Sequence, residues 1–166
     1  MSPLALKKMI KNTEVTFNFT CSETSYGDRV AMVGSMALLG HWDPARAVPL
    51  STTKETYPVW TIKIDLPRDR IIEYKFLILK FNGNNNAKAK QNAATFCEVL
   101  GKGGELVEWE TLPLGINRLV DTHGKKEITI SEALGSLESV EEYVEVQSDK
   151  KRFMSSDNLS KEVGHE

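Results

Sequence analysis

The chain has 166 residues, of which 40% are hydrophobic and 27% are charged, and its formal net charge is −2. These values are typical of a soluble globular domain, they exclude a chain that is disordered throughout, and no apolar stretch is long enough to span a membrane. Lysine and arginine form no dense stripe with aromatic residues, so the sequence predicts neither a nucleic acid nor a membrane as partner.

The N-terminal leader is expected over residues 1–12, and it lacks the apolar core of a signal peptide. Cys21 and Cys97 are the two cysteines of the chain, too few for a dense disulfide framework. We therefore expect reduced thiols and a cytoplasmic protein.

Several segments alternate between apolar and polar residues, which is the pattern of half-buried strands. The first such segment covers residues 15–21, and a short apolar run follows at 30–33. After a loop that carries Trp42, the alternation returns over residues 60–66 and again from residue 71 to residue 81. Lys75 falls on the polar side of that last strand and is predicted to point outward.

Residues 82–105 are rich in Asn, Ala, Lys and Gly and are predicted as a long insertion. Short strands are expected at 106–110 and at 127–130, the second as the last strand of the fold. Because the first 130 residues show almost no helical pattern, the sequence predicts an all-β sandwich or barrel, with its domain over residues 13–133.

The composition shifts to Glu, Ser and Lys from residue 131 onward. Leu134, Leu137, Val140 and Val144 are spaced like one face of a helix, and the run beyond residue 147 has little apolar surface to bury. Residues 134–166 are therefore predicted to form a helical or disordered tail.

Motifs of common enzyme classes are absent. Neither the nucleophile motif G-x-S-x-G nor the phosphate loop G-x-x-x-x-G-K-[ST] occurs, and the three histidines lack partners at metal-ligand spacing. Glu108 and Glu110 share a strand face as a glycosidase pair would, but carboxylates beside a strand tryptophan are more often a solvated edge. We predict no catalytic residue, no metal site and no cofactor.

One set of aromatic and polar residues suits a sugar. A glucose ring has an apolar face that a flat indole covers and a rim of hydroxyls that Lys, Glu and Asn side chains hydrogen-bond. The residues of this candidate carbohydrate-binding set are Trp42, Lys75, Trp109, Glu110 and Asn117. Taken singly, each also fits a structural role, since tryptophan is more often a core residue than a ligand platform. Trp60 heads an alternating apolar face and is predicted to lie in the core.

The chain resembles the family 20 carbohydrate-binding modules, which are starch-binding domains. The resemblance runs from about residue 15 to residue 130 and rests on motifs in the family's order: Val33-Gly34-Ser35, Leu39-Gly40-His41-Trp42-Asp43-Pro44, Ala47-Val48-Pro49-Leu50, Tyr57-Pro58-Val59-Trp60, Leu66-Pro67, Glu73-Tyr74-Lys75-Phe76, Val107-Glu108-Trp109-Glu110 and Asn117-Arg118. It implies an immunoglobulin-like antiparallel β-sandwich.

The resemblance also implies roles for individual residues. Trp42 and Trp109 would form a two-ring platform, with Lys75, Glu110 and Asn117 as its hydrogen-bonding rim. Tyr26 matches one tyrosine of the family's second site, and Tyr57 is a nearby substitute for the other. The chain departs from the family by a longer segment between Phe76 and Trp109 and by two extra residues between Glu110 and Asn117.

The expected function is non-catalytic binding of starch, amylopectin or glycogen, with an α-glucan or maltooligosaccharide as partner. One alternative is a targeting module from a larger glucan-active enzyme, such as a glucan phosphatase, dikinase or amylase, whose catalytic domain lies elsewhere in a longer polypeptide. Another is a protein-interaction scaffold that docks a partner through the helix expected at 134–144.

Overall fold

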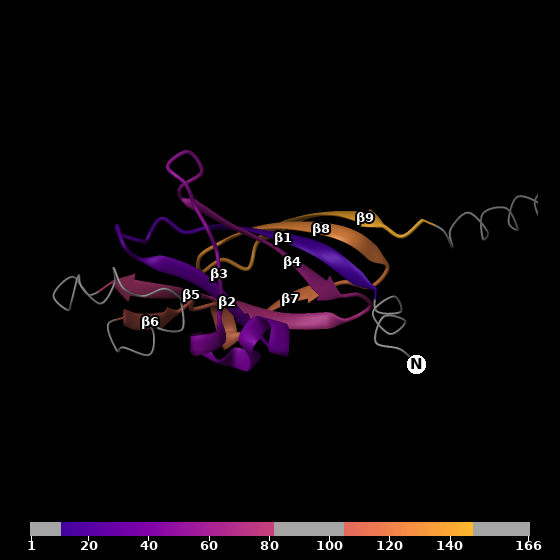
Figure 1. Cartoon of the computed structure of the whole chain (residues 1–166), viewed down its shortest axis with the longest axis horizontal. Helices are drawn as coiled ribbons and strands as arrows, with labels where there is room; N and C mark the ends of the chain where they lie inside the picture. The colour runs from indigo at the N-terminus through magenta and orange to yellow at the C-terminus, as the bar shows by residue number, and fades with distance from the viewer. Residues whose placement is uncertain (1–10, 82–104, 148–166) are drawn as a thin grey trace, which may run out of the picture.

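The computed structural model describes residues 11–81 and 105–147, and in these ranges the chain folds into two facing β-sheets (Figure 1). One sheet has the strand order β4-β1-β8-β9; the other has the order β3-β2-β5-β6, with β7 also paired to β5. The strands are β1 (Asn12–Thr20), β2 (Arg29–Gly34), β3 (Val48–Pro49), β4 (Val59–Pro67), β5 (Ile71–Phe81), β6 (Glu105–Trp109), β7 (Arg118–Asp121), β8 (Lys125–Ala133) and β9 (Ser139–Glu145).

The predicted all-β sandwich is confirmed. Its strand pairs are antiparallel, except that β1 and β8 run parallel. Within the described residues, three short 3-10 helices connect strands: η1 (Ala37–Trp42), η2 (Pro44–Arg46) and η3 (Pro113–Gly115). None of the helices within the described residues has the length and apolar character needed to cross a membrane.

The core lies between the sheets because alternate side chains of each strand point inward. Phe17 and Phe19 of β1 meet Tyr74 and Phe76 of β5, all of them buried. The rings of Phe19 and Phe76 stack with their centroids 3.9 Å apart, and those of Phe17 and Tyr74 meet edge-to-face at 5.0 Å. Trp60 belongs to the same cluster, which confirms its predicted core position.

The helix expected near residues 134–144 is wrong, because Ser139–Glu145 forms strand β9. Gly135, whose φ of 73° lies in the left-handed region, turns the chain after β8, and β9 then pairs antiparallel with β8 from Ser139 to Glu145. Val140 and Val144 are exposed rather than packed on one helical face. Strand 127–130 is therefore not the last one, and the sheet extends past the expected domain boundary at residue 133. Most of the insertion predicted at 82–105, residues 1–10 and residues 148–166 lie outside the described residues.

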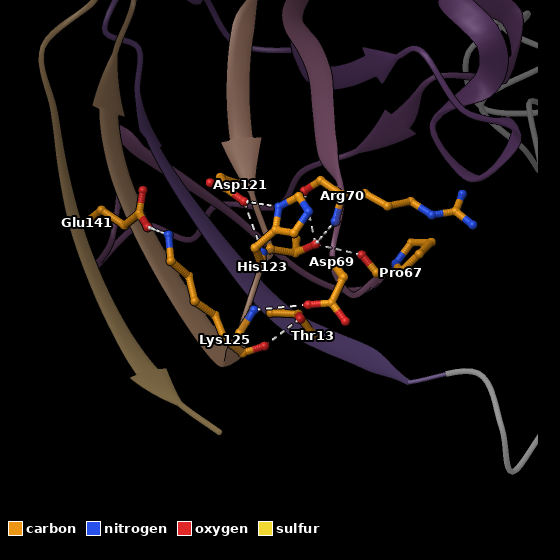
Figure 2. Close-up of polar contacts among 10 residues, drawn as sticks. Thr13, Pro67, Asp69, Arg70, Asp121, His123, Lys125 and Glu141 are labelled. Atoms are coloured by element: carbon orange, nitrogen blue, oxygen red, sulfur yellow. Dashed lines mark hydrogen bonds and ion pairs between the residues drawn. The ribbon is translucent and has the colours of Figure 1, made fainter. Parts of the chain in front are cut away.

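A network of buried threonines and turn residues closes one end of the sandwich (Figure 2). The Thr13 hydroxyl donates to the Lys125 carbonyl at 2.6 Å, and the Thr122 hydroxyl donates to the Pro67 carbonyl at 2.8 Å. Asp69 accepts a hydrogen bond from the Gly124 N–H at 3.1 Å, which joins the β4–β5 turn to the β7–β8 turn. These contacts fix the start of β5, which begins at Ile71, four residues before Lys75.

The same end carries an exposed Asp121–His123 pair. The backbone N–H of His123 donates to the Asp121 carboxylate at 2.9 Å, and the His123 ring lies 2.7 Å from the same oxygen. These two contacts lower the pKa of Asp121. Over residues 11–81 and 105–147, no three His, Cys, Asp or Glu side chains are grouped so as to hold a metal ion.

Candidate functional site

The outer face of the five-stranded sheet brings together most of the predicted sugar-binding residues. Tyr74 and Phe76 of β5 point into the core. Because neighbouring side chains of a strand point to opposite faces, Lys75 and Leu77 point to the outer face. Trp109 of β6 lies directly opposite Leu77 and so stands on that face as well. Trp109 is 40% exposed, and Lys75 is partly exposed between the buried Tyr74 and Phe76, which agrees with its predicted outward direction.

Trp42 reaches the same face from the connection between β2 and β3. An apolar floor of buried residues, formed by Ala31, Val33, Ala47 and Leu77, covers the outer face of the sheet, and the partly buried ring of Trp42 packs against it. Figure 1 shows the purple short helices on the side of β2 that faces away from the other sheet. Trp42, Lys75 and Trp109 therefore lie around one apolar floor.

The local sequence holds Trp42 in place through an uncommon backbone path. Gly40, His41 and Trp42 have φ values of 79°, 48° and 65°, so three successive residues are left-handed. A Cβ at Gly40 would lie 2.7 Å from the Arg46 carbonyl oxygen, which explains why glycine stands there. The Asp43 carboxylate then accepts a hydrogen bond from the Ala45 N–H at 3.0 Å and caps the following helix η2.

Asn117 directly precedes β7, whose first residue, Arg118, pairs with Tyr74 next to Lys75. Its side-chain amide donates to the Glu73 carboxylate at 3.1 Å, and the side chain is partly exposed. Glu73 belongs to the outward-facing residues of β5, as Lys75 does, and it was not among the predicted site residues. The alternation of β5 was the available signal, because it places Glu73 on the same face as Lys75.

Glu110 is not part of an exposed rim, which corrects the expectation from the sequence. Its side chain points between the sheets, and the residue is 4% exposed. Its two carboxylate oxygens accept hydrogen bonds from Nε and Nη2 of Arg118, each at 2.9 Å, and one of them also accepts the Phe76 N–H at 3.0 Å. Both oxygens are thus engaged inside the protein and face away from Trp109.

The buried charge network continues from Arg118 to the opposite sheet. Nη1 of Arg118 lies 3.3 Å from the Glu132 carboxylate, and the Tyr74 hydroxyl donates to the other oxygen of that group. Burial raises the pKa of Glu132, and it raises the pKa of Tyr74 well above the usual range. The Arg118 guanidinium also lies over the Phe76 ring, 5.5 Å from its centroid.

A hollow of about 620 Å³ lies elsewhere on the surface and brings Tyr26 together with Tyr57. Tyr26 is fully exposed, and the Tyr57 hydroxyl is held near the Ser22 and Thr24 carbonyls, at 3.4 and 3.2 Å. The core residue Trp60, 8% exposed, forms part of the wall. The two tyrosines predicted for a second site thus share one surface depression.

Comparison with known proteins decides the family. A model of the starch-binding domain matches residues 12–101, more than half of the chain. The chain belongs to the starch-binding domain family. The resemblance inferred from its motifs is thereby confirmed, and members of this family are non-catalytic binding modules. Trp109, Glu110 and Asn117 follow the matched residues, so their placement rests on the geometry above.

Similar proteins include much longer enzymes. An α-amylase of Thermomonospora curvata is 47% identical over 68 residues, which are 40% of this chain and 11% of that enzyme. A glucan 1,4-α-maltotetraohydrolase of Roseateles saccharophilus is 37% identical over 94 residues, 49% of this chain and 17% of that enzyme. A glucoamylase from Hypocrea jecorina aligns in structure over 76% of this chain and 18% of its own, with a TM-score of 0.55 and 21% identity, and so supports the fold.

Proposed function

We propose that this starch-binding domain holds α-1,4-glucan chains on the outer face of its five-stranded sheet. The observation that carries the proposal is the convergence of Trp42, Lys75 and Trp109 around one apolar floor, from three separate elements. The two indoles would cover the apolar faces of glucose units, and the Lys75 ammonium and the Asn117 amide would donate to ring hydroxyls. Glu110 has no direct part, because its carboxylate is engaged in the interior.

The strength of such a site follows from its area. A stacked sugar ring buries roughly 80 Å² of apolar surface, and at about 25 cal/mol per Å² this gives roughly 2 kcal/mol for each indole. Association costs several kcal/mol, so two stacked rings and a few hydrogen bonds yield affinities of about micromolar to millimolar. A weak site of this kind suits a long polymer, on which a second contact raises the overall affinity.

Tyr26 and Tyr57 supply that second contact in the proposal. They share a hollow with residues 24–28 and with Thr52, Thr53 and Lys54. The exposed ring of Tyr26 is available for stacking on a sugar. Binding at this hollow would give the domain two glucan contacts.

A targeting role in a longer, glucan-active polypeptide is the second candidate. It is favoured because the match with this chain covers only a small part of each similar enzyme: 11% of the α-amylase and 17% of the maltotetraohydrolase. The scaffold alternative loses the feature that motivated it, since β9 replaces the expected helix. Release of glucose or maltooligosaccharides from starch by the chain alone would contradict the non-catalytic proposal.

Calorimetric titration with β-cyclodextrin tests the binding site directly. We expect Trp109→Ala to weaken binding about tenfold or more, near 1.4 kcal/mol, because one stacking surface is lost. Tyr143→Ala is the matched control: Tyr143 is a comparably exposed aromatic residue on β9 of the other sheet, and its removal should leave the affinity unchanged. Equal affinity of Trp109→Ala and the unmodified chain, with both folded, would reject the site.

A further inference from the structure

The sheet has a gap beneath the proposed glucan site. β5 pairs with β7 over residues 71–74 and with β6 over residues 77–81, so both strands occupy the same side of β5 and leave Lys75 and Phe76 between them. Trp109 is the last residue of β6 and Asn117 directly precedes β7. Three residues of the proposed site thus border one interruption of the strand ladder.

The Glu110 side chain spans this gap. Its backbone N–H donates to the Phe76 carbonyl at 3.1 Å, and its carboxylate accepts the Phe76 N–H at 3.0 Å, so Phe76 next to Lys75 has both backbone groups paired. The same carboxylate accepts hydrogen bonds from Nε and Nη2 of Arg118, at 2.9 Å each, and Arg118 directly follows Asn117. Two charge-assisted hydrogen bonds of this geometry fix the orientation of the Arg118 guanidinium relative to the Glu110 carboxylate, as well as the distance between them.

The pair is well isolated from water. The side chains of Arg118 and Glu110 are 3% and 0% exposed, and the guanidinium lies over the rings of Phe76 and Phe19. Nη2 of Arg118 also donates to the Ala133 carbonyl at 2.9 Å, which ties the arrangement to β8. A buried pair of this kind does not fluctuate between paired and solvated forms as a surface ion pair does, because breaking it would leave a charge in the interior.

We infer that Glu110 and Arg118 are positioning residues for glucan binding: they set the spacing of Trp109, Lys75 and Asn117 without touching the sugar. The inference rests on the proposed function of this face. It explains how Glu110 serves binding although its side chain is directed away from the face. The contact also holds the two ends of the segment between Trp109 and Asn117 close together, although this segment has two extra residues.

The test compares two carboxylates of one buried network. Glu110→Gln removes the charge that faces Arg118 at the gap, and Glu132→Gln removes the charge that faces Arg118 from β8, away from the site segments. Glu110→Gln should lower the melting temperature, because the buried Arg118 loses the charged partner of its two-pronged contact. We expect Glu110→Gln to weaken β-cyclodextrin binding about fivefold or more and Glu132→Gln to change it less than about twofold, measured by calorimetry well below both melting temperatures.

A spectroscopic measurement separates positioning from loss of stability. Protein labelled with 5-fluorotryptophan has three fluorine resonances, one for each tryptophan of the chain, and single Trp→Phe variants assign them. In the absence of sugar, the Trp109 resonance should shift or broaden in Glu110→Gln and stay in place in Glu132→Gln. If Glu110→Gln does not fold, Arg118→Lys carries the same test, since it keeps the charge but loses the two-pronged contact.

The possible outcomes are distinct. Equal affinities of Glu110→Gln and Glu132→Gln, or an unmoved Trp109 resonance in Glu110→Gln, would overturn the positioning role while the proposed function stands. Absence of β-cyclodextrin binding by the unmodified, folded chain would instead overturn the proposed function itself.

Discussion

At the scale of single residues, Trp109 and Glu110 are neighbours in the chain with opposite environments. Strand alternation turns the indole to the outer face and the carboxylate into the core, where the carboxylate accepts hydrogen bonds from Arg118. The energetic consequence is large, because a buried carboxylate persists only with a paired charge and full hydrogen bonding. Glu132 enters the same network with one arginine shared between two carboxylates.

The burial of Glu132 predicts a pH dependence of stability. Burial raises the pKa of Glu132 above 4.5, its ordinary value, so the folded state binds this proton more readily than the unfolded state does. The contribution of Glu132 to stability is therefore fully present below about pH 4.5 and is lost as the pH rises through the folded-state pKa. Glu132→Gln removes the titrating group.

Urea unfolding of the unmodified chain and of Glu132→Gln between about pH 7 and about pH 4.5 measures the effect. The free energy of unfolding of the unmodified chain minus that of the variant should increase as the pH falls. A difference that stays constant, or that decreases over this range, would contradict the raised pKa.

At the scale of elements, the connection that carries Trp42 depends on Gly40. Alanine at Gly40 would meet the Arg46 backbone at 2.7 Å and would also sit at a φ of 79°. We expect Gly40→Ala to cost about 2 kcal/mol or more in the free energy of unfolding and to weaken glucan binding, because the left-handed path that presents Trp42 must shift.

Gly124→Ala is the matched control for this prediction. Gly124 has a similar φ of 66°, but a Cβ there would meet no atom within 4 Å, so only the backbone cost of about 1 kcal/mol remains. Urea unfolding and β-cyclodextrin titration of both variants check the comparison. Equal destabilisation by the two substitutions, with unchanged glucan affinity, would show that the Gly40 turn does not position Trp42.

Element prediction from sequence succeeded where one period was clear. The alternation in β1, β4 and β5 predicted strands whose inward faces form the core. It failed for β9, because Val140 and Val144 also fit a helical period and no local signal distinguishes the two periods in so short a segment. The turn at Gly135 and the pairing with β8 decided the outcome, and pairing is a non-local property.

At the scale of the whole molecule, the proposed site lies on the outer face of the five-stranded sheet, and the other sheet packs against the inner face. Trp42 and Trp109 were recognisable from sequence as candidate sugar platforms, and the outward direction of Lys75 followed from alternation alone. The interior position of Glu110 did not follow, because it depends on Arg118 arriving from a different strand with matching geometry. The meeting of Tyr26 and Tyr57 in one hollow likewise depends on two connections folding together.

In the proposed complex, glucan lies against Trp42 and Trp109 on the outer face of the five-stranded sheet. Titration of the isotope-labelled chain with maltoheptaose, followed by nuclear magnetic resonance, locates the bound sugar. We expect the indole N–H signals of Trp42 and Trp109 and the amide signals near Lys75 and Asn117 to shift together and saturate. Shifts confined to β9 or to the Asp121–His123 end, or no shift at millimolar sugar, would show that glucan does not bind this face.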